Sequence, residues 1–279
     1  MNYQKNRYTV LMTVYDGDDV NYLMQSLSSI ENQTLKPNQV IIIVDGPIRE
    51  EINNLLKSFK SKLNDYTIIS LPENVGLGRA LNMGLTQVKY DFIARMDSDD
   101  ISKPDRFEKQ INYMVLNEDL SILGTDVLEF QYDISKPFNY KRMPHTRNEV
   151  IRFSKIKDPF NHPSVVFRTK DLLEQGGYSD LRKSQDTELW LRMLSNGYFG
   201  ENLDEPLLYF RFNDGTFKKR KSWINTKLLL SIKFKYFKIG YIKFHHLLYS
   251  IIRQIFIFIT PIYVIKMLTR KKYFSEKET

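Results

Sequence analysis

Three carboxylates lie within the four residues from Asp97 to Asp100, directly after the apolar segment 91–96. Carboxylates at this spacing repel one another unless a divalent cation or several hydrogen-bond donors neutralise them. Oxygen-only ligands favour Mg²⁺ or Mn²⁺ over Zn²⁺, and such ions are commonly held by one or two carboxylates together with substrate phosphates. The segment therefore indicates a metal and phosphate site. The alternative is a solvated acidic turn in which Asp100 or Ser102 caps the next helix.

Two other segments offer groups that suit the same kind of ligand. Asp45 follows a run of β-branched residues and could accept hydrogen bonds from a ribose or a base, or could be a plain turn residue. Residues 74–82 begin a predicted helix with Gly76 and Gly78, and such helix N-termini attract phosphate, to which Arg79 would add donors. The glycine spacing is not GxGxxG, so it does not indicate a dinucleotide site, and an ordinary loop is the alternative.

The elements that would position these residues alternate between short apolar runs and helical patterns. Strands are predicted at residues 8–15, 40–44, 66–71 and 91–96. Helices are predicted at residues 19–33, 48–63 and 78–88, and a further helix from Pro104. This alternation predicts an α/β fold with a mainly parallel, doubly wound sheet, which binds ligands beyond the carboxyl ends of its strands. Three of these ends carry polar groups, at residues 13–19, 45–46 and 97–100.

The second part of the chain has a more mixed pattern. Strands are predicted at residues 121–130, 162–168 and 207–212, with a helix at 186–196. Asp126 and Glu129, in the first of these strands, are expected on the surface. From Trp223 onward the sequence is basic and aromatic, with apolar helical stretches.

The net charge of +8 is distributed unevenly along the 279 residues. Residues 216–279 hold 15 Lys and Arg against 2 acids, a net charge of +13, whereas residues 1–215 hold 26 against 31, a net charge of −5. Such asymmetry suggests a polyanionic partner, either nucleic acid or an anionic membrane. The absence of cysteine excludes a disulfide framework, a thiolate zinc site and a cysteine nucleophile. Residues 1–15 do not form a signal peptide, so a cytoplasmic location is expected.

Several motifs in a fixed order carry a resemblance to a known family. The first half supplies Thr13-Val14-Tyr15, Val44-Asp45-Gly46, Asn74 to Asn82, and Met96 to Asp100. The second half supplies His162 to Arg168, Gly176-Gly177-Tyr178, and Gln185 to Arg192. Over about residues 7–215 the chain resembles family-two inverting glycosyltransferases with the GT-A fold, especially those that build bacterial capsule, exopolysaccharide or O-antigen repeat units.

The resemblance implies a role for each matching residue. The donor nucleotide and sugar would contact Thr13, Val14, Tyr15, Asp45, Arg79, Asp97, Ser98 and Arg211. A Mn²⁺ or Mg²⁺ ion would be bound by Asp99 and Asp97, with His162 as a further candidate ligand. The acceptor would contact His162, Gly177, Tyr178 and Trp190. Asp186 would be the general base, since an inverting transfer must take a proton from the attacking hydroxyl.

The resemblance also implies a domain division. Residues 1–215 would form a GT-A domain with a nucleotide-sugar half, about 1–120, and an acceptor half, about 121–215. Three positions depart from the family's pattern: Pro47 and Gln185 stand where acids are frequent, and Asn213 stands near the place of a histidine in some relatives. These differences affect the metal and nucleotide contacts rather than the reaction class.

Two of the implied site residues have ordinary structural alternatives, and a third, Asp186, has a competitor for its role. Trp190, at helical spacing with Met193, fits a core position better than a sugar-stacking platform. His162 precedes a proline and could be a structural loop residue. Glu188 could compete with Asp186 as the base, but two residues along a helix place it on a different face.

The basic tail combines charge with apolar helical segments. Residues 218–221 are all Lys or Arg, and residues 247–265 are apolar except for Arg253, Gln254 and Pro261. An arginine near the centre of a spanning helix is costly, so the pattern favours an interfacial, monotopic helix pair on an anionic membrane over a membrane span. The alternatives are helices that pack on the catalytic body or form a homo-oligomer interface. A nucleic-acid partner is disfavoured.

The combined hypothesis is a peripheral enzyme on the cytoplasmic face of the membrane. It would move a hexose from a UDP-sugar to a lipid-diphosphate-linked saccharide, with β-1,3-galactosyl transfer from UDP-galactose as the specific expectation. Two alternatives are a non-catalytic subunit of a polysaccharide assembly complex and a sugar-nucleotidyltransferase. The second would need a glycine-rich, basic loop after the first strand, which residues 13–19 do not provide.

Overall fold

The computed structural model describes residues 6–60, 65–212 and 223–260 of the chain. Its centre is one mixed sheet, whose first four strands pair in parallel in the order β3–β2–β1–β4. These strands are β1 (Tyr8–Val14), β2 (Gln39–Val44), β3 (Tyr66–Ser70) and β4 (Phe92–Met96). All six residues of β2 are buried, because helices cover both faces of a parallel sheet.

The sheet continues from β4 into the second half of the chain. The short strand β8 (Val166–Arg168) pairs antiparallel with both β4 and β6 (Leu120–Phe130). Beyond β6 lie β9 (Phe199–Arg211), parallel to it, and β5 (Ile101–Ser102), with β7 (Asn139–Lys141) on the side of β6. The two halves of the chain therefore share a single hydrogen-bonded sheet.

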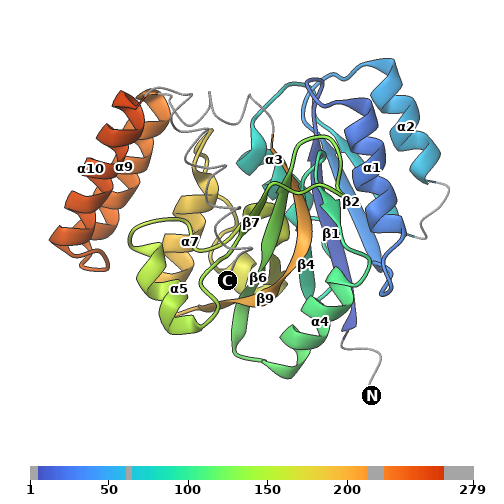
Figure 1. Cartoon of the computed structure of the whole chain (residues 1–279). Coiled ribbons are helices and arrows are strands. Elements are labelled where there is room, and N and C mark those ends of the chain that lie inside the picture. Colours follow the sequence, from blue (N-terminus) through green and yellow to red (C-terminus); the bar gives the residue numbers. More distant parts are fainter. Residues whose placement is uncertain (1–5, 61–64, 213–222, 261–279) are drawn as a thin grey trace.

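Two helical layers enclose this sheet (Figure 1). One face packs against α1 (Val20–Glu31), α2 (Glu50–Lys60) and α4 (Arg106–Leu116) in one apolar cluster. The other face packs against α3 (Leu77–Leu85), α5 (Arg147–Ser154), α6 (Thr169–Glu174) and α7 (Gln185–Ser195) in a second cluster. Strand residues alternate between the clusters, Val10 in the first and Leu11 in the second, as the two-residue period of a strand requires.

The architecture confirms the predicted α/β class with a mostly parallel sheet, whereas two local expectations and one alternative interpretation are wrong. Helix α4 begins after Asp105, and neither Asp100 nor Ser102 caps it. The segment predicted as a strand at 162–168 divides into a 3₁₀ turn (η2, His162–Ser164) and β8. Strand β9 begins eight residues before the predicted start, because pairing with the buried β6 outweighs the turn-like acids and proline of residues 201–206.

The C-terminal part that the structure describes is a helical hairpin of α9 (Trp223–Lys238) and α10 (Phe244–Ile259), which lies beside α7 (Figure 1). One side packs on the body through an apolar cluster of Leu191, Ile232, Tyr236, Ile242 and Leu247. Among the described residues, no helix combines the length and the apolar character needed to cross a membrane. The basic segment 218–221, Asn213 and residues 261–265 of the predicted apolar stretch lie outside the described residues.

Candidate active site

The acidic segment forms the turn between β4 and β5. Carboxylate oxygens of Asp97, Asp99 and Asp100 lie within 4.8 Å of one another. Burial, followed by the charges of Asp97 and Asp18, raises the pKa of Asp99 to about 6. Burial and the charges of Asp99 and Asp97 raise the pKa of Asp100 well above its ordinary value, and its Oδ2 has no hydrogen-bond partner among the described residues. Repulsion and an unsatisfied buried oxygen are what a divalent cation would relieve, so these residues fit such an ion.

Two arginines neutralise part of this charge. Arg95, fully buried in β4, forms an ion pair with Asp97. Arg211, at the end of β9, donates its backbone N–H to Asp100 Oδ1 at 2.7 Å and its Nε–H to the Asp99 carbonyl at 2.8 Å. Its guanidinium also lies 3.8 Å from the ring centre of Tyr22. Arg211, expected to contact the donor, thus lies beside the acidic segment, whereas the role of Arg95 was not predicted.

Asp45 binds the loop that precedes α3. Its Oδ1 accepts from the N–H of Val75 at 2.7 Å, and its Oδ2 accepts from the N–H of Gly76 at 3.1 Å. Gly46 has φ +94°, and a Cβ there would lie 2.8 Å from the backbone nitrogen of Asn74. The carboxylate predicted to bind nucleotide thus also holds residues 74–76 in place beside the carboxyl end of β2.

Thr13, Val14 and Tyr15, the three predicted nucleotide contacts at the end of β1, differ in their exposure to solvent. Val14 is fully buried, and its carbonyl accepts from the N–H of Asp45 at 2.8 Å. The Thr13 side chain is partly exposed, and the ring of Tyr15 is 45% exposed. Burial and the charges of Asp18 and Asp99 raise the pKa of Tyr15, so its hydroxyl lies within electrostatic reach of the acidic turn. Tyr15 can therefore present its ring to a ligand at that turn, while Val14 offers only backbone.

Asp186 lies in the first turn of α7, after Ser184, whose φ of +57° is unusual for a residue other than glycine. Its Oδ1 accepts from the N–H of Thr187 at 2.8 Å. The side chain of Asp186 is partly exposed to solvent. Desolvation by the surrounding protein, and then the charge of Asp158, raise its pKa to about 7. Asp97 also contributes to this increase, so the carboxylates of the two halves lie within electrostatic reach of each other.

The other predicted acceptor residues form a buried aromatic group. His162 Nε2 lies 2.8 Å from the hydroxyl of Tyr178, and burial, followed by the charge of Arg95, holds the pKa of His162 well below its ordinary value. His162 is therefore neutral, and its Nε2 is already engaged by Tyr178 rather than grouped with the acidic turn. Trp190 is fully buried and stacks on Phe167 at 5.6 Å between ring centres. This burial favours a core position for Trp190 over a contact with the acceptor.

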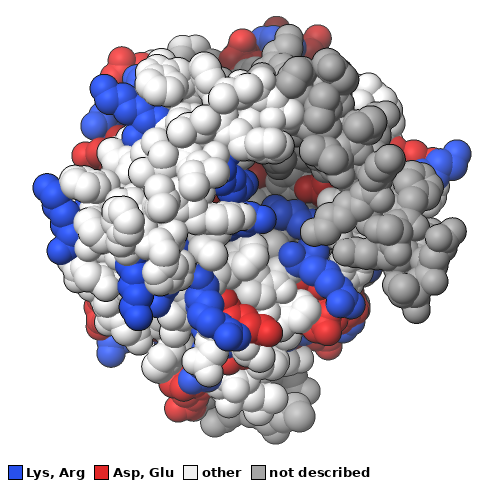
Figure 2. Space-filling model, turned by 60° about the vertical axis from the view of Figure 1, so that its left-hand side comes forward, with Lys and Arg blue, Asp and Glu red and all other residues white. Residues whose placement is uncertain are grey.

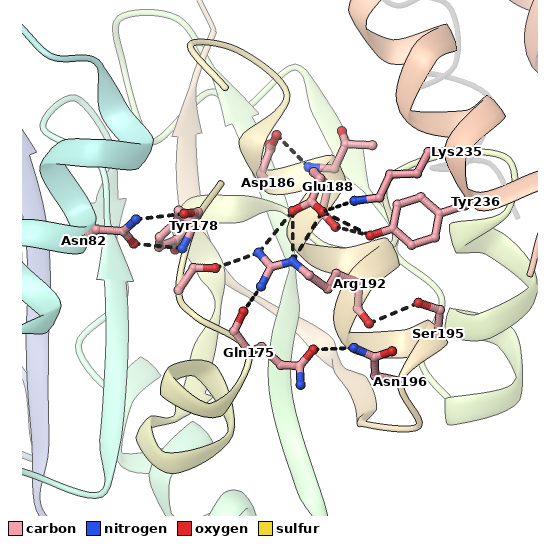
Figure 3. Close-up of polar contacts among 12 residues, drawn as sticks. Asn82, Gln175, Tyr178, Asp186, Glu188, Arg192, Ser195, Asn196, Lys235 and Tyr236 are labelled. Carbon is pink, nitrogen blue, oxygen red and sulfur yellow. Dashed lines mark hydrogen bonds and ion pairs between the residues drawn. The ribbon is translucent and has the colours of Figure 1, made fainter. Parts of the chain in front are cut away.

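A paired contact joins α3 to the loop at Tyr178 in the second half of the chain. The side-chain amide of Asn82 donates to the Tyr178 carbonyl and accepts from the Tyr178 N–H, both at 2.8 Å (Figure 3). Gly177, with φ +68°, lies so close that a Cβ would be 2.5 Å from Asn82 Oδ1. Arg79 pairs with Asp180 at 3.2 Å in an exposed contact of the same two segments. Ser98 lies partly exposed within the acidic turn.

A second acidic group was missed from the sequence. Asp126, expected on the surface, is fully buried and accepts from the N–H of Met143 at 2.7 Å. Its carboxylate oxygens lie 3.2 Å from His145 Nε2, and Asp204 completes the group. Glu129 is also buried, and it accepts from the amide of Asn139 at 2.7 Å. Strand β6 packs Leu123 in one apolar cluster and Ile122 in the other, so both of its faces are covered and a polar residue in this strand is not thereby exposed.

Residues 9–176 match the family described as Glycosyl transferase family 2. The chain belongs to this family. It is 35% identical over 257 residues to a UDP-Gal:alpha-D-GlcNAc-diphosphoundecaprenol beta-1,3-galactosyltransferase of Escherichia coli, covering 91% of this chain and 92% of the relative. It is 36% identical over 216 residues to the amylovoran biosynthesis glycosyltransferase AmsE of Erwinia amylovora, covering 77% and 80%. The chain is thus a family 2 glycosyltransferase of the kind found in polysaccharide synthesis.

Solved structures confirm the GT-A fold of this family 2 chain. Residues 1–349 of TarS from S. aureus in complex with UDP-GlcNAc superpose with a TM-score of 0.67 at 16% identity, covering 90% of this chain and 72% of that one. A mannosyltransferase from Pyrobaculum calidifontis in complex with GDP-Man and Mn²⁺ gives a TM-score of 0.63 at 14% identity, covering 90% and 69%. At these identities the likeness concerns the fold alone.

Proposed function

We propose that this glycosyltransferase moves a hexose with inversion from a UDP-sugar to a lipid-diphosphate-linked saccharide, with UDP-galactose as donor and a β-1,3 linkage as product. The observation that carries the reaction class is the group of Asp97, Asp99 and Asp100 carboxylates within 4.8 Å of one another, in a chain that belongs to the family Glycosyl transferase family 2. A donor beside the acidic turn and an acceptor beside Asp186 would then meet between them. The donor, acceptor and linkage are those in the name of the Escherichia coli relative.

In this proposal the acceptor hydroxyl attacks the anomeric carbon while its proton passes to the carboxylate of Asp186. The bond from that carbon to the diphosphate breaks, and the diphosphate leaves with the electron pair. Tyr15 and the loop held by Asp45 would contact the nucleotide, and Arg211 would face the diphosphate. Much of the acceleration would come from positioning the two sugars, since oriented reactants avoid most of the entropic cost of encounter.

The acidic turn is the proposed cation site. Asp97, Asp99 and Asp100 would hold Mg²⁺ or Mn²⁺, and Asp100 Oδ2 would gain the partner that it lacks among the described residues. When bound, the ion would supply Lewis-acid stabilisation of the charge on the diphosphate. His162 is not part of this proposal, because its Nε2 contacts Tyr178.

The test is a panel of UDP- and GDP-sugars scored for hydrolysis and for transfer to lipid-diphosphate acceptors, with Mn²⁺, Mg²⁺ or a chelator. Asp99→Asn should abolish metal-dependent turnover, whereas Asp204→Asn, which removes an acid from the second acidic group, should leave it intact. Asp186→Asn should bind the donor but lose transfer. Full transfer by Asp186→Asn would remove this residue as the base, and equal loss in Asp204→Asn would remove the metal assignment.

We further propose that the C-terminal hairpin lies on an anionic membrane at the cytoplasmic face. Residues 223–259 hold six Lys and Arg and no acid. The exposed side of α10 presents the large apolar side chains Leu248, Tyr249, Ile252, Ile255, Phe256 and Ile259. Figure 2 turns the hairpin side of the molecule toward the viewer, and uncharged atoms cover much of that view, with several Lys and Arg and a few acidic side chains among them. Apolar burial with adjacent basic groups is the chemistry of interfacial helices.

Co-sedimentation with vesicles tests this surface. The full chain should bind vesicles rich in phosphatidylglycerol better than phosphatidylcholine vesicles, and the double variant Ile252→Asp/Ile255→Asp should lose binding. Leu116→Asp is the matched control, because Leu116 is an exposed apolar residue on α4. If the double variant kept vesicle binding but changed the oligomeric state, the face would be a homo-oligomer interface instead.

A further inference from the structure

Glu188 is a buried carboxylate for which the reaction proposed above has no use. It lies two residues after Asp186 on α7, and its side chain is directed toward α9 while Asp186 lies on a different side of the helix (Figure 3). Arg192 contacts Glu188 Oε2 from Nε and Nη2, both at 3.1 Å. From α9, the hydroxyl of Tyr236 donates to Glu188 Oε1 at 3.1 Å, and Lys235 Nζ lies 3.3 Å away.

The contacts that Lys235 and Tyr236 make with Glu188 differ in strength. Lys235 is 60% exposed, and an exposed ion pair contributes little because solvent screens it. Tyr236 is buried, and burial together with the Glu188 charge raises its pKa, so its hydroxyl stays protonated and donates. A hydrogen bond from a buried hydroxyl to a buried carboxylate is among the stronger polar contacts. Tyr236 is therefore the main polar connection between the hairpin and Glu188.

From Glu188 the contacts continue toward the acceptor side. Arg192 donates from Nη2 to the Gly177 carbonyl at 2.7 Å, and from Nη1 to the Gln175 carbonyl (Figure 3). Tyr178, which follows Gly177, is hydrogen-bonded to Asn82 through its backbone and to His162 through its hydroxyl. A chain of buried and partly buried contacts thus connects α9, helix α7 from Glu188 in its first turn to Arg192 in its last turn, and the loop at Gly177.

We propose that Glu188 and Tyr236 are positioning residues for the acceptor side of the reaction. The hairpin would fix the orientation of α7 and, through Arg192, the loop at Gly177. This inference rests on the proposed role of Asp186. It assigns the C-terminal hairpin a part in catalysis that is separate from its proposed contact with the membrane.

The test compares two Tyr→Phe variants in the same hairpin. Tyr236→Phe removes the hydrogen bond to Glu188, whereas Tyr241→Phe removes a hydrogen bond of 2.9 Å to Ser154 on α5, and among the described residues Tyr241 has no hydrogen bond to α7. We expect Tyr236→Phe to lower kcat of transfer about tenfold with little change in the donor KM, and Tyr241→Phe to stay near the wild type. Equal losses in both variants, or no loss in Tyr236→Phe, would overturn the proposal.

Amide hydrogen exchange separates this inference from the proposed function. Peptides that cover residues 185–195 should exchange faster in Tyr236→Phe than in Tyr241→Phe, whether or not a donor has been identified. Unchanged exchange in Tyr236→Phe would refute the positioning of α7. By contrast, full transfer by Asp186→Asn would refute the assigned base while leaving the exchange result valid.

Discussion

The contact between Gly177 and Asn82 gives a prediction whose magnitude follows from the geometry. Gly176 and Gly177 both have positive φ, +75° and +68°. An alanine at either position has to adopt a left-handed conformation, which costs about 1–2 kcal/mol and is partly offset by a less flexible unfolded chain. A Cβ on Gly176 would meet nothing within 4 Å, whereas one on Gly177 would lie 2.5 Å from Asn82 Oδ1 and 2.9 Å from Leu85 Cδ1.

The difference between the two alanine variants isolates that close approach. In Gly177→Ala the amide of Asn82 has to move, and its two hydrogen bonds to Tyr178 are each worth about 1 kcal/mol. We expect Gly176→Ala to lose at most about 1 kcal/mol of unfolding free energy and Gly177→Ala to lose about 2–4 kcal/mol. Urea unfolding followed by circular dichroism measures both. A difference below about 0.5 kcal/mol would refute the idea that Asn82 and Gly177 hold the two halves together.

Three further predictions concern ionisable groups. Burial and the charge of Asp158 raise the pKa of Asp186 to about 7, and a base acts in its ionised form, so kcat of transfer should fall as pH decreases through about 7. Asp158→Asn should move this fall to lower pH. An unchanged pH profile in Asp158→Asn would contradict the assignment of Asp186 as the base. Burial lowers the pKa of Lys233 from 10.5 to about 8, so the unfolded chain binds the Lys233 proton more tightly than the folded chain does. The unfolding free energy of the wild type should therefore rise by up to about 3 kcal/mol between pH 8 and 10.5. Parallel urea titrations of Lys233→Met should lack this increase. Asp45→Ala should raise the donor KM and lower the unfolding free energy by about 1–3 kcal/mol, because two backbone N–H groups lose their acceptor; a donor KM equal to that of the wild type would argue against Asp45 as part of the nucleotide site.

The first half of the fold could be predicted from sequence because its signals are local. A continuous apolar run such as Val40–Val44 indicates a strand buried on both faces. The alternation of such strands with helices predicted the parallel sheet, and the acids that follow the strands indicated the edge of the sheet where a ligand would bind. The second half depends on contacts that are distant in sequence. Strand β9 takes its register from β6, and no local pattern in residues 199–206 indicated that pairing.

The candidate site shows the same limit at the level of single residues. Asp97 and Asp99 stood out because clustered carboxylates at a strand end repel one another, and Asp186 stood out through the family resemblance. Arg95 looked like any polar residue of a strand, and its ion pair with Asp97 depends on how β4 is covered. The burial of Trp190 likewise follows from the helix packing around α7.

The short strand β8 has a consequence for exchanging parts between relatives. It is hydrogen-bonded to β4 on one side and to β6 on the other, so both halves of the chain share its register. A chimera that took its acceptor half from another family member would have to reproduce this pairing and also supply a glycine opposite Asn82. The two halves of the chain are therefore not interchangeable modules. New acceptor specificity is better sought by substituting side chains within the existing frame than by grafting the half as a unit.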